Sequence, residues 1–290
     1  MKQCLCACAL LLFSIKISVA NSVTDFMRAL TTDEPSVLQK KIDEEKKASE
    51  DLYGITLYEP TYVLPLYYTA RPYYSVYGGS SPEDQQVTHT KLKAQLSLAV
   101  PVFNFSKNTA LKLSYTQMFY WQFYARSRYF RESSYKPQLF ISSNPIKNWL
   151  IEAGVAHESN GRGGDLERSW NRAFVDVSLS GEHWMLSVKP WILILKAASS
   201  DLRNKDIDKF LGYGRILAAY KTHDNTFSLM LRNNVTSGFR FGTVEATWSF
   251  PLKKYVKGYI QAFSGYGQSL IEYDHYTNSI GIGVILNDVI

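Results

Sequence analysis

The fold is decided by residues 91–102, which read KLKAQLSLAVPV. Apolar side chains occupy every second position from Leu92 to Val102, and lysine, glutamine and serine stand between the first of them. A repeat of two is that of a β-strand, whose alternate side chains point to opposite faces. Strands of ordinary globular domains average about 5–6 residues, whereas membrane-spanning strands need about 9–11. The stretch therefore predicts a long strand with one lipid-facing side.

The same alternation returns along the rest of the chain, for example from Leu111 to Phe123. An even number of strands is typical of single-chain bacterial barrels. A soluble β-sandwich shows similar alternation, but the strand length and the even count favour an all-β, twelve-stranded antiparallel transmembrane barrel over residues 55–290. The candidate strands lie at 55–69, 90–103, 109–125, 134–143, 148–159, 170–181, 183–196, 209–222, 224–235, 240–251, 255–267 and 277–288.

Residues 1–20 have the pattern of a secretory signal peptide. Lys2 supplies the positive start, an apolar stretch follows, and Ser18-Val19-Ala20 is a small-residue cleavage site. The alternative is an uncleaved anchor helix, but Lys16 interrupts the apolar run, which is also short for a membrane span. We expect cleavage after Ala20 and export to the outer membrane of a Gram-negative cell.

The composition of the remaining chain agrees with an exported barrel. The three cysteines all lie within residues 1–20, so the mature chain has neither disulfides nor thiol chemistry. Removing Lys2 and Lys16 lowers the net charge from +6 to +4, which suits anionic headgroups and does not indicate nucleic acid. The 20 tyrosines, 15 phenylalanines and 6 tryptophans are typical of the aromatic girdles of membrane barrels.

Residues 21–54 differ from the rest of the chain. Acidic and basic residues alternate there with scattered apolar ones, and the pattern predicts a helix interrupted near Pro35. We interpret the segment as a short, solvated N-terminal periplasmic extension. A helix that binds a partner is the alternative.

Strand parity points to a polar group on the lipid-facing wall. Ala153 and Val155 belong to the apolar set of one strand, and the same parity continues to His157 and Ser159. A hairpin centred at Gly164 places Asn171 directly opposite His157, with Cβ atoms about 4.5–5.5 Å apart. Polar side chains facing lipid are costly, so they indicate function. A nucleophile, a base and an orienting residue therefore converge.

Other interpretations of these residues remain open. A His-x-Ser pair is common on ordinary surfaces, and residues 161–165 also have the composition of a plain flexible loop. His157-Glu158 has no second histidine at metal-ligand spacing. Parity and spacing alone do not separate an enzyme from a passive, porin-like channel. Inward-facing charges, namely Lys91, Lys93, Lys112 and Glu152, favour an internal polar network over a pore lining.

Two motifs give the chain a family resemblance. His157-Glu158-Ser159-Asn160-Gly161-Arg162, followed by Arg168-Ser169-Trp170-Asn171-Arg172, resembles the signature of the outer-membrane phospholipase A family. Similar blocks run in order from about Ile55 to the end of the chain, among them Pro137-Gln138-Leu139-Phe140 and Phe263-Ser264-Gly265-Tyr266-Gly267.

The resemblance implies a specific chemistry. It predicts a twelve-stranded barrel that hydrolyses acyl esters of phospholipids and lysophospholipids in a calcium-dependent reaction. Ser159 would be the nucleophile, His157 the general base and Asn171 the orienting residue. A neutral asparagine fixes the imidazole tautomer but adds little charge stabilisation. Calcium would offset that weakness at the oxyanion site.

The resemblance also implies the calcium ligands and the active assembly. The family's loop carbonyl maps to Arg162, and its ligand serine corresponds to Glu167, where a carboxylate is the better ligand for a hard cation. Ser127 takes the role of a serine contributed by the second subunit of a calcium-bridged homodimer. Leu96 and Leu98 match the family's dimer surface. Gln117 faces lipid among apolar residues, so we expect its amide to bond across the dimer axis.

Overall fold

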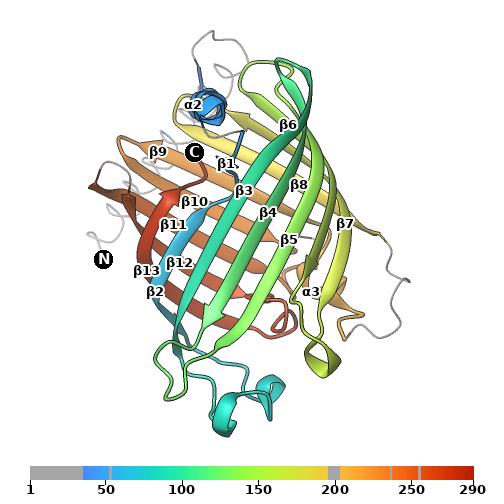
Figure 1. Cartoon of the computed structure of the whole chain (residues 1–290), viewed down its shortest axis with the longest axis vertical. Coiled ribbons are helices and arrows are strands. Elements are labelled where there is room, and N and C mark those ends of the chain that lie inside the picture. Colours follow the sequence, from blue (N-terminus) through green and yellow to red (C-terminus); the bar gives the residue numbers. More distant parts are fainter. Residues whose placement is uncertain (1–34, 52–53, 195–202, 236, 254–255) are drawn as a thin grey trace, which may run out of the picture.

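The computed structural model describes residues 35–51, 54–194, 203–235, 237–253 and 256–290. Within these ranges, thirteen strands form one antiparallel sheet. The long strands β2 to β13 close into a barrel, because β13 pairs with β2 and β3 pairs with both β2 and β4 (Figure 1). The predicted twelve-stranded barrel is confirmed. The predicted signal peptide, residues 1–20, lies outside the described residues.

The elements follow one another as up-and-down hairpins. The barrel strands are β2 (Thr61–Thr69), β3 (Thr90–Ser106), β4 (Thr109–Trp121), β5 (Phe130–Ser143), β6 (Trp149–Ser159), β7 (Ser169–Ser180), β8 (Trp184–Ile194), β9 (Gly214–Thr222), β10 (Asn225–Arg232), β11 (Thr243–Lys253), β12 (Val256–Gly265) and β13 (Thr277–Asn287). The shorter elements are β1 (Thr56–Leu57), the helices α2 (Val37–Asp51) and α3 (Ile207–Leu211), and the 3-10 turns η1 (Ser75–Tyr77), η2 (Pro82–Asp84) and η3 (Gly164–Leu166). Among the described residues, neither helix has the length and apolar character needed to cross a bilayer.

Several strand boundaries predicted from alternation are displaced by a few residues, and two of the predicted strands are wrong in part. The expected strand 55–69 is divided into β1 and β2, because Pro60 lacks a backbone donor and Tyr58 turns inward to bond Glu152. The expected strand 209–222 begins only at Gly214. Residues 207–211 form α3 instead, which buries Phe210 and Leu211 inside the barrel and ends where Gly212 takes a φ of 66°.

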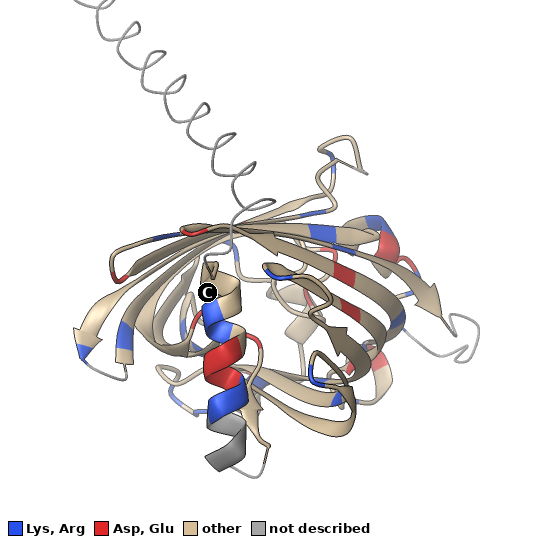
Figure 2. Ribbon diagram, turned by 90° about the horizontal axis from the view of Figure 1, so that it is seen from above, with Lys and Arg blue, Asp and Glu red and all other residues tan. Residues whose placement is uncertain are grey.

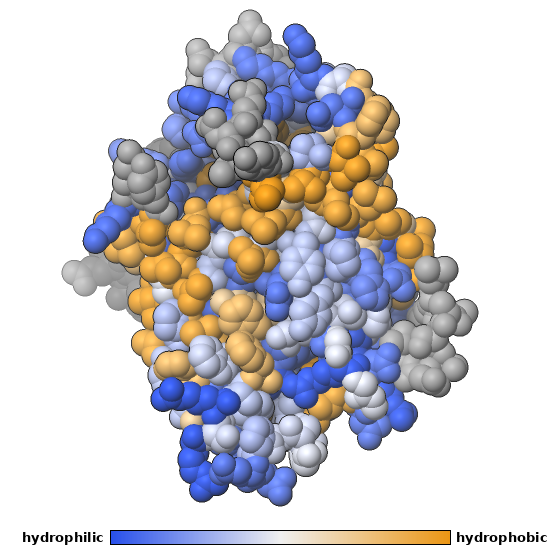
Figure 3. Space-filling view, viewed as in Figure 1, coloured by the Kyte–Doolittle hydropathy of each residue, from blue (hydrophilic) through white to orange (hydrophobic). Residues whose placement is uncertain are grey.

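The two parities of each strand have opposite surroundings, as the alternation predicts. Leu96 is 43% exposed on the outer wall, whereas Lys91 and Lys93 of the same strand are buried inside. Figure 3 shows apolar side chains gathered in a band across one face of the barrel, with hydrophilic residues toward both ends. Lys93 donates to Gln261, and Glu152 accepts from Tyr58. The Lys91 ammonium has no partner among the described residues, so the predicted internal network is incomplete there.

Helix α2 lies across one open end of the barrel (Figure 2). Ser36 caps it by accepting from the amide of Gln39, in the Ser-x-x-Gln pattern of a capping box. The helix is docked through Ser36, which bonds Asn148 and Ser180, and through Lys41, which donates to the carbonyl of Asp288. The interpretation of this segment as fully solvated is therefore wrong for residues 36–39, which are buried.

The apolar contacts of α2 explain why it docks. Val37 and Leu38 pack against Met185, Leu217 and the terminal Ile290. Docking also removes charged side chains of the helix from solvent: burial lowers the pKa of Lys41 and raises the pKa of Glu45. The amphipathic helix thus uses its apolar face to close one end of the barrel.

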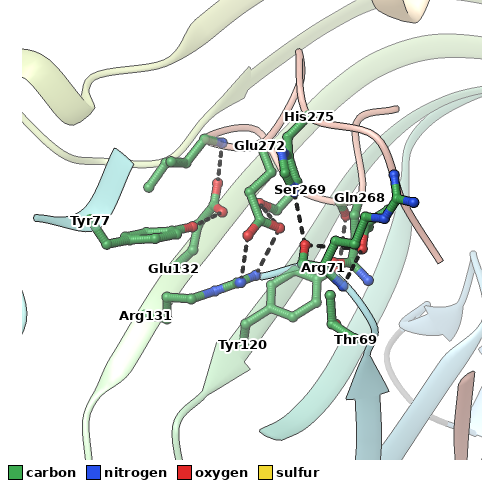
Figure 4. A network of polar contacts seen from close by, with 12 residues as sticks. Thr69, Arg71, Tyr77, Tyr120, Arg131, Glu132, Gln268, Ser269, Glu272 and His275 are labelled. Carbon is green, nitrogen blue, oxygen red and sulfur yellow. Dashed lines mark hydrogen bonds and ion pairs between the residues drawn. The ribbon is translucent and has the colours of Figure 1, made fainter. Parts of the chain in front are cut away.

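The opposite end of the barrel is filled by the chain itself. Residues 266–276, between β12 and β13, fold inward, and Leu270 and Tyr273 join a core that includes α3. Figure 4 shows the polar contacts that hold this segment: Glu272 forms a fully buried ion pair with Arg131 at 2.6 Å, and Glu132 accepts from the amide of Ile271. Between the two closures lies a charged cavity of about 920 Å³.

Candidate active site

The β6–β7 hairpin has the register that the sequence predicts. His157 is directly opposite Asn171, and Ser159 is opposite Ser169. The three polar residues share the outward parity of Val155 and Val175, which are 45% and 43% exposed. His157 Nδ1 lies 2.8 Å from Asn171 Oδ1, which joins the two side chains on the outer wall. The hairpin therefore brings a base and its orienting group together.

Ser159 lies next to His157 and Asn171 on the outer wall. It follows His157 by two residues on one strand, so the two Cα atoms are about 6.5 Å apart on the same face. Within the described chain, no hydrogen bond joins the Ser159 hydroxyl to His157. Hydroxyl–imidazole contacts of this kind are often loose in unliganded enzymes and tighten with substrate.

The loop that follows Ser159 is organised by Asn160, which is buried. Its Oδ1 accepts from the amides of Arg162 and Arg168, and its Nδ2 donates to the carbonyl of Leu166. Gly161 has a φ of 62°, and a Cβ there would lie 3.0 Å from the ring of Tyr135. A residue without a side chain is therefore needed between Asn160 and Arg162.

The two predicted calcium ligands of this loop are oxygen donors. The Arg162 side chain donates to the carbonyls of Phe130 and Arg131, which fixes the backbone that carries the Arg162 carbonyl. The half-buried carboxylate of Glu167 takes neither a hydrogen bond nor an ion pair from any described residue. An unpaired carboxylate and a fixed carbonyl in one loop are oxygen donors of the kind that fits a hard cation.

Ser127 lies apart from these ligands, in the turn between β4 and β5. Its backbone exchanges hydrogen bonds with the side chain of Gln85. No contact among the described residues brings Ser127 to Arg162 or Glu167 within one chain, and no cluster of three metal-ligating His, Cys, Asp or Glu side chains occurs in that part of the chain. The predicted contribution of Ser127 depends on a second subunit.

The three predicted dimer residues lie on the outer wall. Leu96 pairs with Gln117 across β3 and β4, and Leu98 pairs with Tyr115. The Gln117 amide oxygen accepts from the Tyr115 hydroxyl at 3.2 Å, so part of its polarity is satisfied within the chain. Its amide nitrogen has no partner among the described residues and is free for a contact across an interface.

Comparison with known proteins settles the family. The model of the family described as phospholipase A1 matches residues 38–286. The chain belongs to this family. Membership confirms the predicted enzyme class, and together with the barrel it confirms a multi-pass protein of the Gram-negative outer membrane.

Individual relatives agree with this phospholipase assignment. Phospholipase A1 of Klebsiella pneumoniae is 37% identical over 209 residues, 69% of this chain and 71% of that protein. The outer membrane phospholipase (OMPLA) dimer of Salmonella typhi, solved with bound calcium, is 32% identical with a TM-score of 0.76, covering 83% of this chain and 95% of that one. An active-site mutant of the Escherichia coli outer membrane phospholipase A, with asparagine replaced by alanine, is 31% identical with a TM-score of 0.74, covering 82% and 93%.

The sequence analysis did not predict the roles of the inward-facing side chains of the β6–β7 hairpin of this phospholipase. Glu158 faces the barrel interior, where it accepts from Trp170 and Arg172. Asn160 was noted only as part of the motif, although its side chain makes three hydrogen bonds that join the two ends of the loop. The available signal was the inward parity of Glu158 and Arg172, since long side chains of opposite charge two residues off the cross-strand register are within reach of each other.

Proposed function

We propose that this phospholipase hydrolyses acyl esters of phospholipids and lysophospholipids with Ser159, His157 and Asn171, requires calcium, and is active as a homodimer. The observation that carries the proposal is the 2.8 Å contact between His157 Nδ1 and Asn171 Oδ1 on the outer wall. A base held in this way, two residues from a serine on the same face, is the arrangement of an activated nucleophile.

The hydrogen bond to Asn171 determines what His157 can do. An amide oxygen only accepts, so His157 Nδ1 must carry the proton that it donates. The lone pair of Nε2 then remains available to Ser159. The Ser159 hydroxyl oxygen attacks the acyl carbonyl carbon while its proton passes to Nε2. His157 next protonates the departing glycerol oxygen, which leaves a lysophospholipid and an acyl-serine.

Water completes the cycle. His157 takes a proton from a water molecule that attacks the acyl-serine, and returns it to the Ser159 oxygen as the fatty acid leaves. Both steps use one base in alternating roles. Substrate reaches these residues laterally through the bilayer, because they lie on the outer wall and not on the charged cavity.

The calcium requirement rests on the oxygen donors of the loop. Arg162 would hold the ion through its carbonyl, Glu167 through its unpaired carboxylate and Ser127 from the second subunit. Bound calcium supplies positive charge next to the developing oxyanion, which a neutral asparagine cannot do. The relative from Salmonella typhi that was solved as a dimer with bound calcium supports both the ion and the assembly.

The rival hypothesis is a non-enzymatic barrel, either a channel or a structural protein. Purified protein with calcium should release free fatty acid and lysophospholipid from phospholipid in detergent micelles. Ser159→Ala should abolish this release. Ser169→Ala is the matched control, because Ser169 is the direct cross-strand neighbour of Ser159. Hydrolysis by folded Ser159→Ala at the wild-type rate would exclude Ser159 as the nucleophile.

A further inference from the structure

The residues that flank the proposed catalytic group all face the inside of the barrel. Glu158 lies between His157 and Ser159, and Trp170 and Arg172 lie on either side of Asn171. Since side chains alternate along a strand, the three outward residues have these three inward neighbours. Glu158 is directly opposite Trp170 in the ladder.

The inward neighbours are bonded to one another through a single oxygen. Glu158 Oε2 accepts from Trp170 Nε1 at 3.0 Å and from Arg172 Nη2 at 2.5 Å. The Arg172 guanidinium also lies 3.7 Å above the centre of the Trp170 ring. One carboxylate of β6 thus holds two residues of β7, and these two bracket Asn171.

The group is enclosed and anchored. Trp170 is 5% exposed and packs edge-on against Trp191 of β8. Trp191 in turn donates from its ring nitrogen to the carbonyl of Gly212, next to α3. Within the described chain, the bond to Glu158 is the one side-chain hydrogen bond of Arg172, whose Nε is buried without a partner. The Arg172 side chain is 13% exposed, and a largely enclosed cation with a single acceptor makes that acceptor hard to replace.

We infer that Glu158, with Trp170 and Arg172, is an internal clamp that positions the catalytic side chains on the other face of the same hairpin. This inference rests on the function proposed above. A slip of one residue between β6 and β7 would turn His157 and Ser159 into the barrel. Smaller shifts also matter, since a displacement of about 1 Å can lower a rate about 100-fold. Glu158 is a positioning residue, because it touches neither substrate nor the reacting atoms.

The test compares two substitutions at Glu158 with the same substitutions at Glu152. Glu152 is the matched control: it is another inward-facing carboxylate of β6, and it accepts from Tyr58 instead of from residues of β7. We expect Glu158→Ala to lower kcat at least 10-fold with KM changed less than 2-fold. Glu158→Gln should restore most of kcat, because an amide oxygen still accepts from Trp170 and Arg172. Glu152→Ala and Glu152→Gln should keep kcat within 2-fold.

A second readout reports the geometry of the catalytic group without lipid, at saturating calcium. A sulfonyl fluoride reacts when the serine oxygen bonds to sulfur, fluoride leaves and the proton passes to the base. Its second-order rate with Ser159 should fall in Glu158→Ala in parallel with kcat and recover in Glu158→Gln. A purely structural role would lower the amount of folded barrel and leave the rate per folded molecule unchanged.

Three results would overturn the clamp. They are wild-type kcat and sulfonylation rate in folded Glu158→Ala, an equal loss of kcat in Glu152→Ala, and no rescue by Glu158→Gln. If Glu158→Ala does not fold, Trp170→Phe decides, because it keeps an aromatic ring under Arg172 and removes the donor to Glu158. That variant should lose kcat at least 3-fold at constant KM, and unchanged kcat refutes the clamp. Activity in Ser159→Ala would instead refute the proposed function, so the two failures are distinguishable.

Discussion

Gln117 and Ser159 lie in one row across the outer wall, with only Tyr135 between them. Gln117 pairs with Tyr135 across β4 and β5, and Tyr135 pairs with Ser159 across β5 and β6. Leu96 continues the row on β3. Neighbouring strands are about 4.8 Å apart, so Gln117 is roughly 10 Å from Ser159. A second subunit that covers Gln117 would therefore also border the proposed active site.

The first prediction concerns this shared surface. Gln117→Ala should lower the fraction of cross-linked dimer in detergent with calcium, because it removes a polar contact of a kind that is worth about 0.6–2 kcal/mol between transmembrane helices. Leu229→Ala is the control, since Leu229 also faces lipid, with 43% of its surface exposed, but lies on β10. Equal dimer fractions in the two variants would remove Gln117 from the interface.

The second prediction concerns calcium. Glu167→Ala should raise the calcium concentration needed for half-maximal hydrolysis at least 10-fold, because it removes the one unpaired carboxylate oxygen donor proposed for the site. Chelation should also shift wild-type protein to the monomer. Asp165→Ala is the control, because Asp165 lies in the same loop and its side chain is 92% exposed and paired with Arg203. Calcium titrations of hydrolysis and of cross-linking test both points, and identical titrations for the two variants would contradict the ligand role of Glu167.

The third prediction concerns the orienting residue. Asn171→Ala should lower kcat about 10- to 100-fold with little change in KM, because His157 loses the acceptor that fixes its tautomer. Asn171→Asp keeps an acceptor oxygen and should retain more activity than Asn171→Ala. Steady-state kinetics on micellar phospholipid measure both. Equal activity of Asn171→Ala and wild type would mean that His157 is oriented by another group.

The fourth prediction concerns the buried ion pair shown in Figure 4. Glu272→Ala leaves Arg131 buried and unpaired, which should destabilise the barrel by about 3–5 kcal/mol. Glu83→Ala removes the exposed partner of Arg126 and should change stability by less than about 1 kcal/mol. Heat- and urea-induced unfolding, followed by the gel mobility of the folded barrel, compares the two. Similar losses would show that residues 266–276 contribute little to stability.

The fifth prediction concerns the closure by α2. Wild-type protein should give no steady current in a planar bilayer, because α2 and residues 266–276 cover both ends of the cavity. Leu38→Asp places a charge in the apolar contact with Met185 and Leu217, and should produce open-channel current by releasing the helix. Lys47→Asp, on the exposed side of α2, is the control. Steady current through the wild-type protein would mean that the closures are incomplete.

Much of the barrel, and of the outward-facing part of the site, can be predicted from the alternation of apolar and polar residues alone. Parity assigns each residue of a long strand to lipid or interior, and the hairpin centre then fixes which residues face each other. That is why the pairing of His157 with Asn171 is predictable and is found. The membrane makes the assignment of strand faces easier, because every outward-facing side chain in the membrane-spanning part meets the same apolar environment of lipid.

The parts that were not predictable depend on surfaces made by distant segments. The apolar face of α2 indicates that it packs somewhere, but its docking surface combines Gly181, Met185, Leu217 and Ile290. The choice of α3 over a strand depends on the aromatic core that Phe210 completes. The bonds of Glu158 could be anticipated only after the register of β6 and β7 was known.

The docking of α2 has a consequence for the order of assembly. Its binding surface includes the carbonyls of Asp288 and Val289 and the side chain of Ile290, which follow β13. The helix therefore depends on residues that lie far from it in the sequence and that reach it through the last strand of the barrel. The helix can dock only when β13 has paired with β2 and the barrel has closed. A docked α2 therefore indicates that the barrel is fully assembled.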